Sequence, residues 1–315
     1  MEVYRVNQVT QVSTDVPLPK KLKSRKRRRD NIEGYLFIAP ALFGFLAFTL
    51  IPVISVFAIG SLEWDILTPP KWAGLDNYIN LFKDEVFLIS LKNTLLWVLY
   101  YVPASIALSL ALALAMNLPL KGISVYRTLL YIPVISPLIA VSLLFVWLYN
   151  PDFGLINFLL SKLGIDPIGW LTSETLALPS IALMAIWKSA GYNMLIFLAA
   201  LQGIPKHLYE AADLDGATKL QKFWKITFPL LTPATFFIAI MSVIGAFQVF
   251  GEIYVMTSGG PGYSTHTLTY YLWSNAFKYN KMGYACAIAV IMFILILIAT
   301  LIQNKLLGRK VQYDM

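Results

Sequence analysis

The sequence predicts an all-α integral membrane protein with six transmembrane helices and both termini in the cytoplasm. Of its 315 residues 58% are hydrophobic and only 13% are charged, whereas a soluble domain carries roughly 25% charged residues. A globular protein needs a charged surface in water, but a surface that faces lipid does not. Six long neutral segments, with basic residues gathered between them, complete the case for a membrane protein.

Each spanning helix needs about 20 mainly apolar residues. Six windows that lack Asp, Glu, Lys and Arg, except for Lys188 in the fourth, are long enough, and we expect them to span: residues 34–62, 93–120, 128–151, 175–205, 226–251 and 282–304. A seventh neutral stretch, residues 253–277, holds the sequence from Ser258 to Gly262, whose glycines and proline predict a loop. In the second outer connection, the apolar run 155–160 predicts a short helix at the interface.

Orientation follows from the basic residues in the connections. With a cytoplasmic N-terminus, 18 of the 25 Lys and Arg residues fall in inner segments and six in outer ones, while Lys188 lies within a span. Residues 1–30 form a basic arm that ends in a dense run of Lys and Arg, followed by the six-helix domain, residues 31–315. The arm is typical of a topology anchor on anionic lipid, and nucleic-acid contact is the alternative.

The sequence lacks the residue patterns of a metal site or a catalytic site. Cys286 is the single cysteine, so no intrachain disulfide forms, and His207 and His266 lack neighbours at metal-ligand spacing. The sequence contains neither the phosphate-binding G-x-x-x-x-G-K-[ST] pattern nor an H-E-x-x-H or G-x-S-x-G motif. We therefore expect a protein that is not an enzyme and that binds no cofactor.

The connection between the fourth and fifth spans, about residues 203–229, is the most informative segment. Pro205 suits a first helical position, residues 206–215 contain no helix breaker, and Gly216 suits a left-handed helix end. Residues 219–228 predict a second helix, with Pro229 starting the next span. The acidic residues Glu210, Asp213 and Asp215 on an otherwise basic side indicate a docking surface for a partner, although a solvated linker would also fit.

The same segment carries a motif. Its fixed positions, Glu210-Ala211-Ala212, Gly216, Ile226 and Phe228-Pro229, resemble the EAA motif of ABC importer permeases, where Leu usually stands in place of Phe228. The resemblance implies a coupling helix that docks on an ATP-hydrolysing subunit, with Glu210 facing a basic residue and Gly216 making the turn. The coupling residues it implies are Glu210, Ala211, Ala212, Asp213, Gly216, Ile226 and Pro229.

From about Asn31 to Asn304 the chain is similar to maltose-type sugar permeases, including the sequences Thr257 to Pro261 and Tyr270 to Phe277. This implies the ABC type I importer fold in a bacterial or archaeal cytoplasmic membrane. It also implies four partner types: a second homologous permease, two ATPase subunits that hold ATP and Mg, an extracytoplasmic binding protein and a carbohydrate. A glycerol phosphate or polyamine permease is the alternative. An ion-coupled transporter is less favoured, because such proteins place acidic residues within spans.

Polar residues within the fourth and fifth spans are the candidates for solute contact. Lys188 either reaches the headgroups, pairs with a helix or binds solute. The family resemblance implies solute contacts in these two spans, at positions matched here by Lys188, Ser189, Tyr192 and Ser242, with Gln248 and Glu252 available nearby. Small or apolar residues at Gly245, Ala246 and Val249 set the chain apart from a maltose site, and ordinary helix packing is the alternative.

Overall fold

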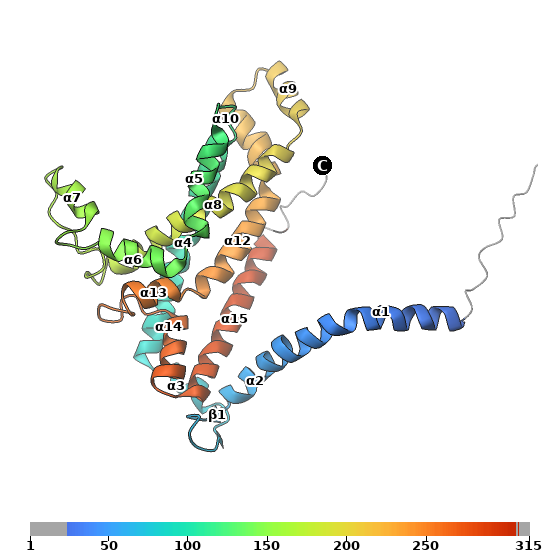
Figure 1. Ribbon diagram of the computed structural model, residues 1–315, viewed down its shortest axis with the longest axis vertical. Coiled ribbons are helices and arrows are strands. Elements are labelled where there is room, and N and C mark those ends of the chain that lie inside the picture. The colour runs from blue at the N-terminus through green and yellow to red at the C-terminus, as the bar shows by residue number, and fades with distance from the viewer. Residues whose placement is uncertain (1–23, 307, 309–315) are drawn as a thin grey trace, which may run out of the picture. The chain divides into compact units, whose positions relative to one another are not determined.

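The computed structural model describes residues 24–306 and Gly308 (Figure 1). Most of the basic arm, residues 1–30, lies outside these described residues. The chain divides into two compact units, residues 1–55 and 56–315. Apolar residues continue in helical form through three consecutive elements: α1 (Ser24–Phe45), the π-helical turn η1 (Leu46–Leu50) and α2 (Ile51–Gly60), which begins in the first unit and ends in the second. Residues 30–60 are long and apolar enough to cross a membrane.

The second unit contains three more unbroken helices of spanning length: α4 (Glu85–Met116), α8 (Ala177–Gly203) and α15 (Met282–Leu306). Two bent helix pairs also qualify when each is taken as one span. The first joins α5 (Ile123–Ile135) to α6 (Leu138–Leu148) at 97°, and the second joins residues 219–230 to α12 (Thr232–Phe247) at 61°. The described chain therefore holds four candidate spans, or six with the bent pairs, and each overlaps an expected window.

Short elements connect these helices. The chain after α2 forms an antiparallel pair, β1 (Leu62–Glu63) and β2 (Lys71–Trp72), with Leu62 opposite Trp72, followed by α3 (Asp76–Leu81). The interfacial helix expected at 155–160 is present as α7 (Leu155–Ser161). The remaining connections contain α9 (Lys206–Leu214), α10 (Lys219–Lys222), η2 (Phe223–Thr227), α11 (Phe228–Leu230), α13 (Gly251–Met256), α14 (Leu268–Trp273) and η3 (Ser274–Lys278).

Two expected boundaries need correction. The fifth window was expected to run unbroken from 226 to 251, with Pro229 as its start. Instead, α11 ends at Leu230, α12 ends at Phe247, and α13 begins only at Gly251. Prolines at 229 and 233 and glycines at 245 and 251 weaken helix continuity here, which neutrality alone does not reveal. The stretch 253–277 does contain the expected loop, residues 257–267, between α13 and α14.

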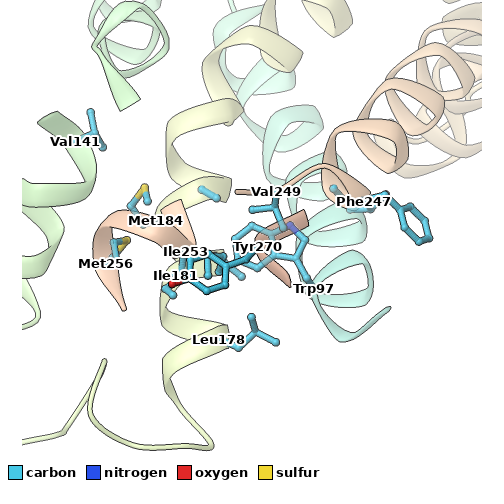
Figure 2. Packing of buried hydrophobic residues seen from close by; sticks show 14 of the residues in the cluster. Trp97, Val141, Leu178, Ile181, Met184, Phe247, Val249, Ile253, Met256 and Tyr270 are labelled. Atoms are coloured by element: carbon cyan, nitrogen blue, oxygen red, sulfur yellow. The ribbon is translucent and has the colours of Figure 1, made fainter. Parts of the chain in front are cut away.

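A hydrophobic core surrounds α8, which is the most buried of the four single-helix candidate spans in the described chain. Figure 2 shows Leu178, Ile181 and Met184 of α8 meeting Trp97 of α4 and Ile253 of α13. A second core lies farther along α8, where Phe197, Leu201 and Ile204 pack with Leu231 and Ile238. Because both cores share α8, this helix links the centre of the unit to the segment that contains α9.

Asp84 fixes the start of α4. Its carboxylate accepts hydrogen bonds from the backbone N–H groups of Val86 at 2.9 Å and Phe87 at 3.4 Å, as an N-cap does. It also accepts hydroxyl hydrogen bonds from Tyr284 of α15, at 2.7 Å, and from Tyr271 of α14. Burial raises the pKa of Asp84, but these hydrogen bonds outweigh burial and hold the pKa below its usual value. The ionised group thus joins three helices.

Candidate coupling loop and solute cavity

The segment between α8 and α12 folds as two short helices around a glycine. Pro205 occupies the N-cap of α9, one position before the first helical residue where it was expected. The helix ends as expected at Gly216, which has a positive φ of 74°. Here the Ala217 N–H donates to the carbonyl of Ala212 at 2.9 Å, closing the helix end. Only glycine takes this backbone conformation without strain.

The chain then enters α10 through a capping box. The Gln221 N–H donates to Thr218 Oγ1 at 3.3 Å, and the Thr218 N–H donates to Gln221 Oε1 at 2.8 Å. The π-helical turn η2 follows and places Thr227, which is buried, under α9. Ile226 packs against the second core, whereas Phe228 is exposed.

Two contacts hold α9 from behind. The Tyr209 hydroxyl lies 2.8 Å from Thr227 Oγ1, and Lys222 Nζ lies 2.6 Å from Asp213 Oδ1. Leu208 and Tyr209 pack on the second core. The opposite face of α9 is exposed, including Glu210 and Ala211.

An apolar side chain stands at the tip of that exposed face. Leu214, the last residue of α9, is 90% exposed and adjoins the exposed residues Asp213, Asp215 and Gly216. Of the expected coupling residues, Glu210, Ala211 and Gly216 are exposed, Asp213 is exposed but paired with Lys222, and Ala212 and Pro229 are half-buried.

A cavity of about 490 Å³ lies midway along α8. Its wall comes from α4, both sides of the α5–α6 break, α8, α12 and the start of α13. The lining residues are Trp97, Tyr101, Val134, Leu138, Ala185, Lys188, Ser189, Tyr192, Gly245, Ala246, Gln248, Val249, Phe250, Gly251 and Glu252. Five of the six residues expected near solute therefore share one wall.

Ser242 is the exception. It lies in α12 one turn before Gly245 and Ala246, is only 7% exposed, and does not line the cavity. Sequence reasoning also missed the contribution of α4. Trp97 and Tyr101, one turn apart, stack with ring centroids 6.0 Å apart at an interplanar angle of 10°. Aromatic residues occur throughout these spans, so nothing in the sequence marked this pair.

The cavity wall offers three kinds of contact. Trp97, Tyr101, Tyr192 and Phe250 supply aromatic surface, and Ser189 and Gln248 supply neutral hydrogen-bonding groups. Lys188 and Glu252 supply one charge of each sign. Lys188 Nζ already donates to two backbone carbonyls, those of Pro133 at 3.2 Å and Val134 at 3.3 Å.

Polar contacts behind the wall hold α4 against α8. Asn193 donates from Nδ2 to Ser105 Oγ at 3.2 Å, and Ser105 Oγ lies 3.5 Å from Ser189 Oγ. These groups are largely buried and so fix the facing of the two helices. Ser189 therefore has two positions at once: it lines the cavity, and its hydroxyl contacts Ser105 of α4.

The loop at residues 257–267 is packed on α4. Asn93 donates from Nδ2 to the carbonyls of Tyr263 at 2.8 Å and His266 at 3.0 Å. The His266 ring Nδ1 lies 3.2 Å from Ser90 Oγ. Burial, with a smaller effect of Lys278, lowers the pKa of His266 to about 4, so the ring is neutral at pH 7.

Within the described residues no three His, Cys, Asp or Glu side chains gather as a metal site would require.

Comparison with known proteins shows the family to which the chain belongs. Residues 87–313 match the family described as binding-protein-dependent transport system inner membrane component. The probable ABC transporter permease protein YesP of Bacillus subtilis (strain 168) is 42% identical over 297 residues, which cover 93% of this chain and 96% of YesP. The arabinooligosaccharides transport system permease protein AraP of the same organism is 38% identical over 277 residues, 87% of this chain and 88% of AraP.

A solved structure shows the same fold. A chain of a bacterial ABC transporter involved in the import of the acidic polysaccharide alginate superposes with a TM-score of 0.80 at 25% identity, covering 91% of this chain and 99% of that one. The family match spans most of the chain and includes both the α9 segment and α8. The chain therefore belongs to the binding-protein-dependent transport system inner membrane components, the membrane-spanning permeases of ABC importers.

Proposed function

We propose that this chain is one of two homologous permeases in an ABC importer for a carbohydrate, either a sugar or an oligosaccharide. An extracytoplasmic binding protein delivers the solute, and two partner ATPase subunits bind ATP and Mg and drive import. The chain itself hydrolyses nothing. The observation that carries this proposal is α9, whose acidic face is exposed while its other face is fastened to the core.

The proposed topology has six spans and cytoplasmic termini. It counts each bent pair, α5–α6 and residues 219–230 with α12, as one span. In Figure 1, α9 and α10 lie at one end of the second unit, while β1 and α3 lie at the other end. This placement fits an inner α9 segment and an outer β1–α3 segment. The excess of basic residues in the inner connections supports the same orientation.

For the solute, we propose the cavity beside α8. Aromatic faces suit the C–H surfaces of sugar rings, and serine, glutamine and glutamate groups suit their hydroxyls. Ser189, Tyr192, Gln248 and Glu252 are the proposed contacts, with Lys188 at the wall. Ser242, behind that wall, is proposed only as support. The carbohydrate in the name of AraP favours this class of solute over glycerol phosphate or a polyamine.

The proposal is tested by purification from the native membrane. The chain is tagged, extracted in mild detergent, and its co-purifying proteins are identified by mass spectrometry, beside Glu210→Lys and the control Asp166→Lys. Asp166 is an exposed acidic residue on the proposed outer side, so the control makes the same charge change elsewhere. We expect the ATPase and a second permease with wild type and Asp166→Lys, and at least tenfold less ATPase with Glu210→Lys.

Two results would contradict the proposal. Recovery of the chain without an ATPase would remove the importer and return ion-coupled transport as the hypothesis to test. Equal ATPase recovery with Glu210→Lys would show that α9 is not the docking element. Uptake assays with arabinooligosaccharides, glycerol phosphate and polyamines would then separate the proposed solute from its alternatives.

A further inference from the structure

The break between α5 and α6 leaves backbone carbonyls without helical partners. In a continuous helix the carbonyl of residue i accepts the N–H of residue i+4. For Pro133 that donor would come from Pro137, which has no N–H. For Val134 it would come from Leu138, but Leu138 already begins α6, which is turned by 97°. Inside a membrane such unpaired carbonyls are costly, because lipid offers no hydrogen bonds.

Lys188 of α8 supplies the missing donors. Its Nζ lies 3.2 Å from the Pro133 carbonyl oxygen and 3.3 Å from that of Val134. An ammonium group has three donors, so one group serves both carbonyls. The C-terminal end of a helix also carries a partial negative charge, which a lysine complements.

A glycine on the same face of α8 brings the two helices close enough for this contact. At Gly191, three residues after Lys188, an added Cβ would lie 2.2 Å from the Leu130 carbonyl oxygen and 3.2 Å from the Tyr131 Cα. The backbones of α8 and α5 therefore touch one turn from the break. Gly191 sets the spacing, and Lys188 reaches from α8 to the end of α5.

The bend shapes the cavity. Val134 lies just before the break and Leu138 just after it, and both line the wall. Leu138 in turn meets α13, since a Cβ added at Gly251 would lie 2.7 Å from Leu138 Cδ2. A change in the angle between α5 and α6 would therefore move the wall that faces Gln248 and Glu252.

We infer that Lys188 is a positioning residue, which caps the C-terminal end of α5 from α8 and so fixes the bend that shapes the cavity. Its role in import rests on the proposed function, but its role at the break does not. Glu252 is then the charged wall group that a solute meets directly. A lysine devoted to solute would instead have its ammonium free of the backbone.

Spin labels on either side of the break test this inference in the full-length chain. Val125 of α5 and Leu143 of α6 are 61% and 56% exposed, so each accepts a cysteine in a Cys286→Ala background. With a rise of 1.5 Å per residue, the two backbone positions are about 18 Å apart across a 97° bend and about 27 Å apart along a straight helix. The label distance therefore reports the bend directly.

Four variants give distinct expectations. Lys188→Arg keeps a cationic donor and should preserve the short distance, as should the control Lys92→Met, which removes an exposed lysine in the N-terminal part of α4. Lys188→Met should lengthen and broaden the distance. In Pro137→Ala/Lys188→Met, residue 137 regains an N–H for the Pro133 carbonyl, so we expect one narrow, long distance.

An unchanged distance in Lys188→Met would overturn the inference. If Lys188→Met is not recovered as a monodisperse protein, recovery of the double variant alone supports a capping role, and loss of both contradicts it. The measurement uses neither solute nor ATPase. A distance change without ATPase co-purification would support the cap and reject the importer proposal. An unchanged distance with normal ATPase co-purification would reject the cap and support the importer proposal.

Discussion

The α9 segment and the solute cavity are built in opposite ways. The α9 segment comes from one continuous stretch, residues 203–229, and the side-chain hydrogen bonds and ion pair within it join residues at most 18 positions apart. The cavity is assembled from six regions that span residues 97–252, and its bonds from Lys188 cross more than 50 positions. Local sequence therefore determines the shape of the first region, whereas packing of distant helices determines the second.

This difference has consequences for what substitutions do. In the α9 segment a single backbone position can reshape the surface, because the turn between the two short helices depends on the positive φ of Gly216. In the cavity, several helices form the wall, so a change at a residue that only contacts solute, such as Gln248, should leave the wall in place; Lys188, which bonds the backbone at the α5–α6 break, is the exception. The predictions below test this contrast, from the largest expected effect to the smallest.

Gly216→Val should give the largest loss. Valine at a φ of 74° costs roughly 1–3 kcal/mol of backbone strain. We expect the turn to rearrange to relieve this strain, which changes the orientation of α9. We expect at least a tenfold drop in co-purified ATPase and in uptake. Gly164→Val is the matched control, since Gly164 has a φ of 75° with nothing within 4 Å, in the connection after α7. Similar losses in both variants would indicate general strain and not a lost docking surface.

Sequence alone predicted the α9 segment because its signals are adjacent. Glu210, Gly216 and the prolines lie close together, and helix and turn preferences act over that range. The cavity was predicted only as a set of positions in two spans. Ser242 was placed with them by family position, yet it lies behind the wall. Trp97 was missed because it comes from a helix that carried no unusual polar group.

Helix boundaries show the same limit. Neutral windows located every candidate span, because lipid exposure is a property of composition. They gave no sign of the 97° bend or of the gap between Phe247 and Gly251, because a neutral segment can be straight or broken. Pro137 was visible in the sequence, but the lysine that compensates for it lies on another helix.

Gln248→Ala should have an intermediate effect. Removal of one hydrogen bond to a neutral group costs about 1–1.5 kcal/mol, so the uptake KM should rise roughly five- to tenfold with little change in the maximal rate. The measurement is uptake of labelled arabinooligosaccharide into vesicles that contain the complete importer. Gln303→Ala is the control, because Gln303 lies on α15 and donates to the Ala239 carbonyl, away from the cavity wall. An equal KM change in both variants would argue against the proposed site.

Tyr209→Phe should have the smallest effect, and it bears most directly on how the two regions communicate. It removes the hydroxyl 2.8 Å from Thr227 Oγ1 and keeps the ring in the second core. One hydrogen bond of about 1 kcal/mol is lost, while Lys222 still holds Asp213. ATPase should therefore bind normally, and the solute carried per ATP should fall by about two- to threefold. Thr227→Val removes the same contact from the other side and also the 3.4 Å hydrogen bond from Thr227 Oγ1 to the Lys222 carbonyl, so the double variant should match Thr227→Val alone. Additive losses would mean that the two residues act separately, and that motion of α9 reaches α12 through the apolar contacts of the second core alone.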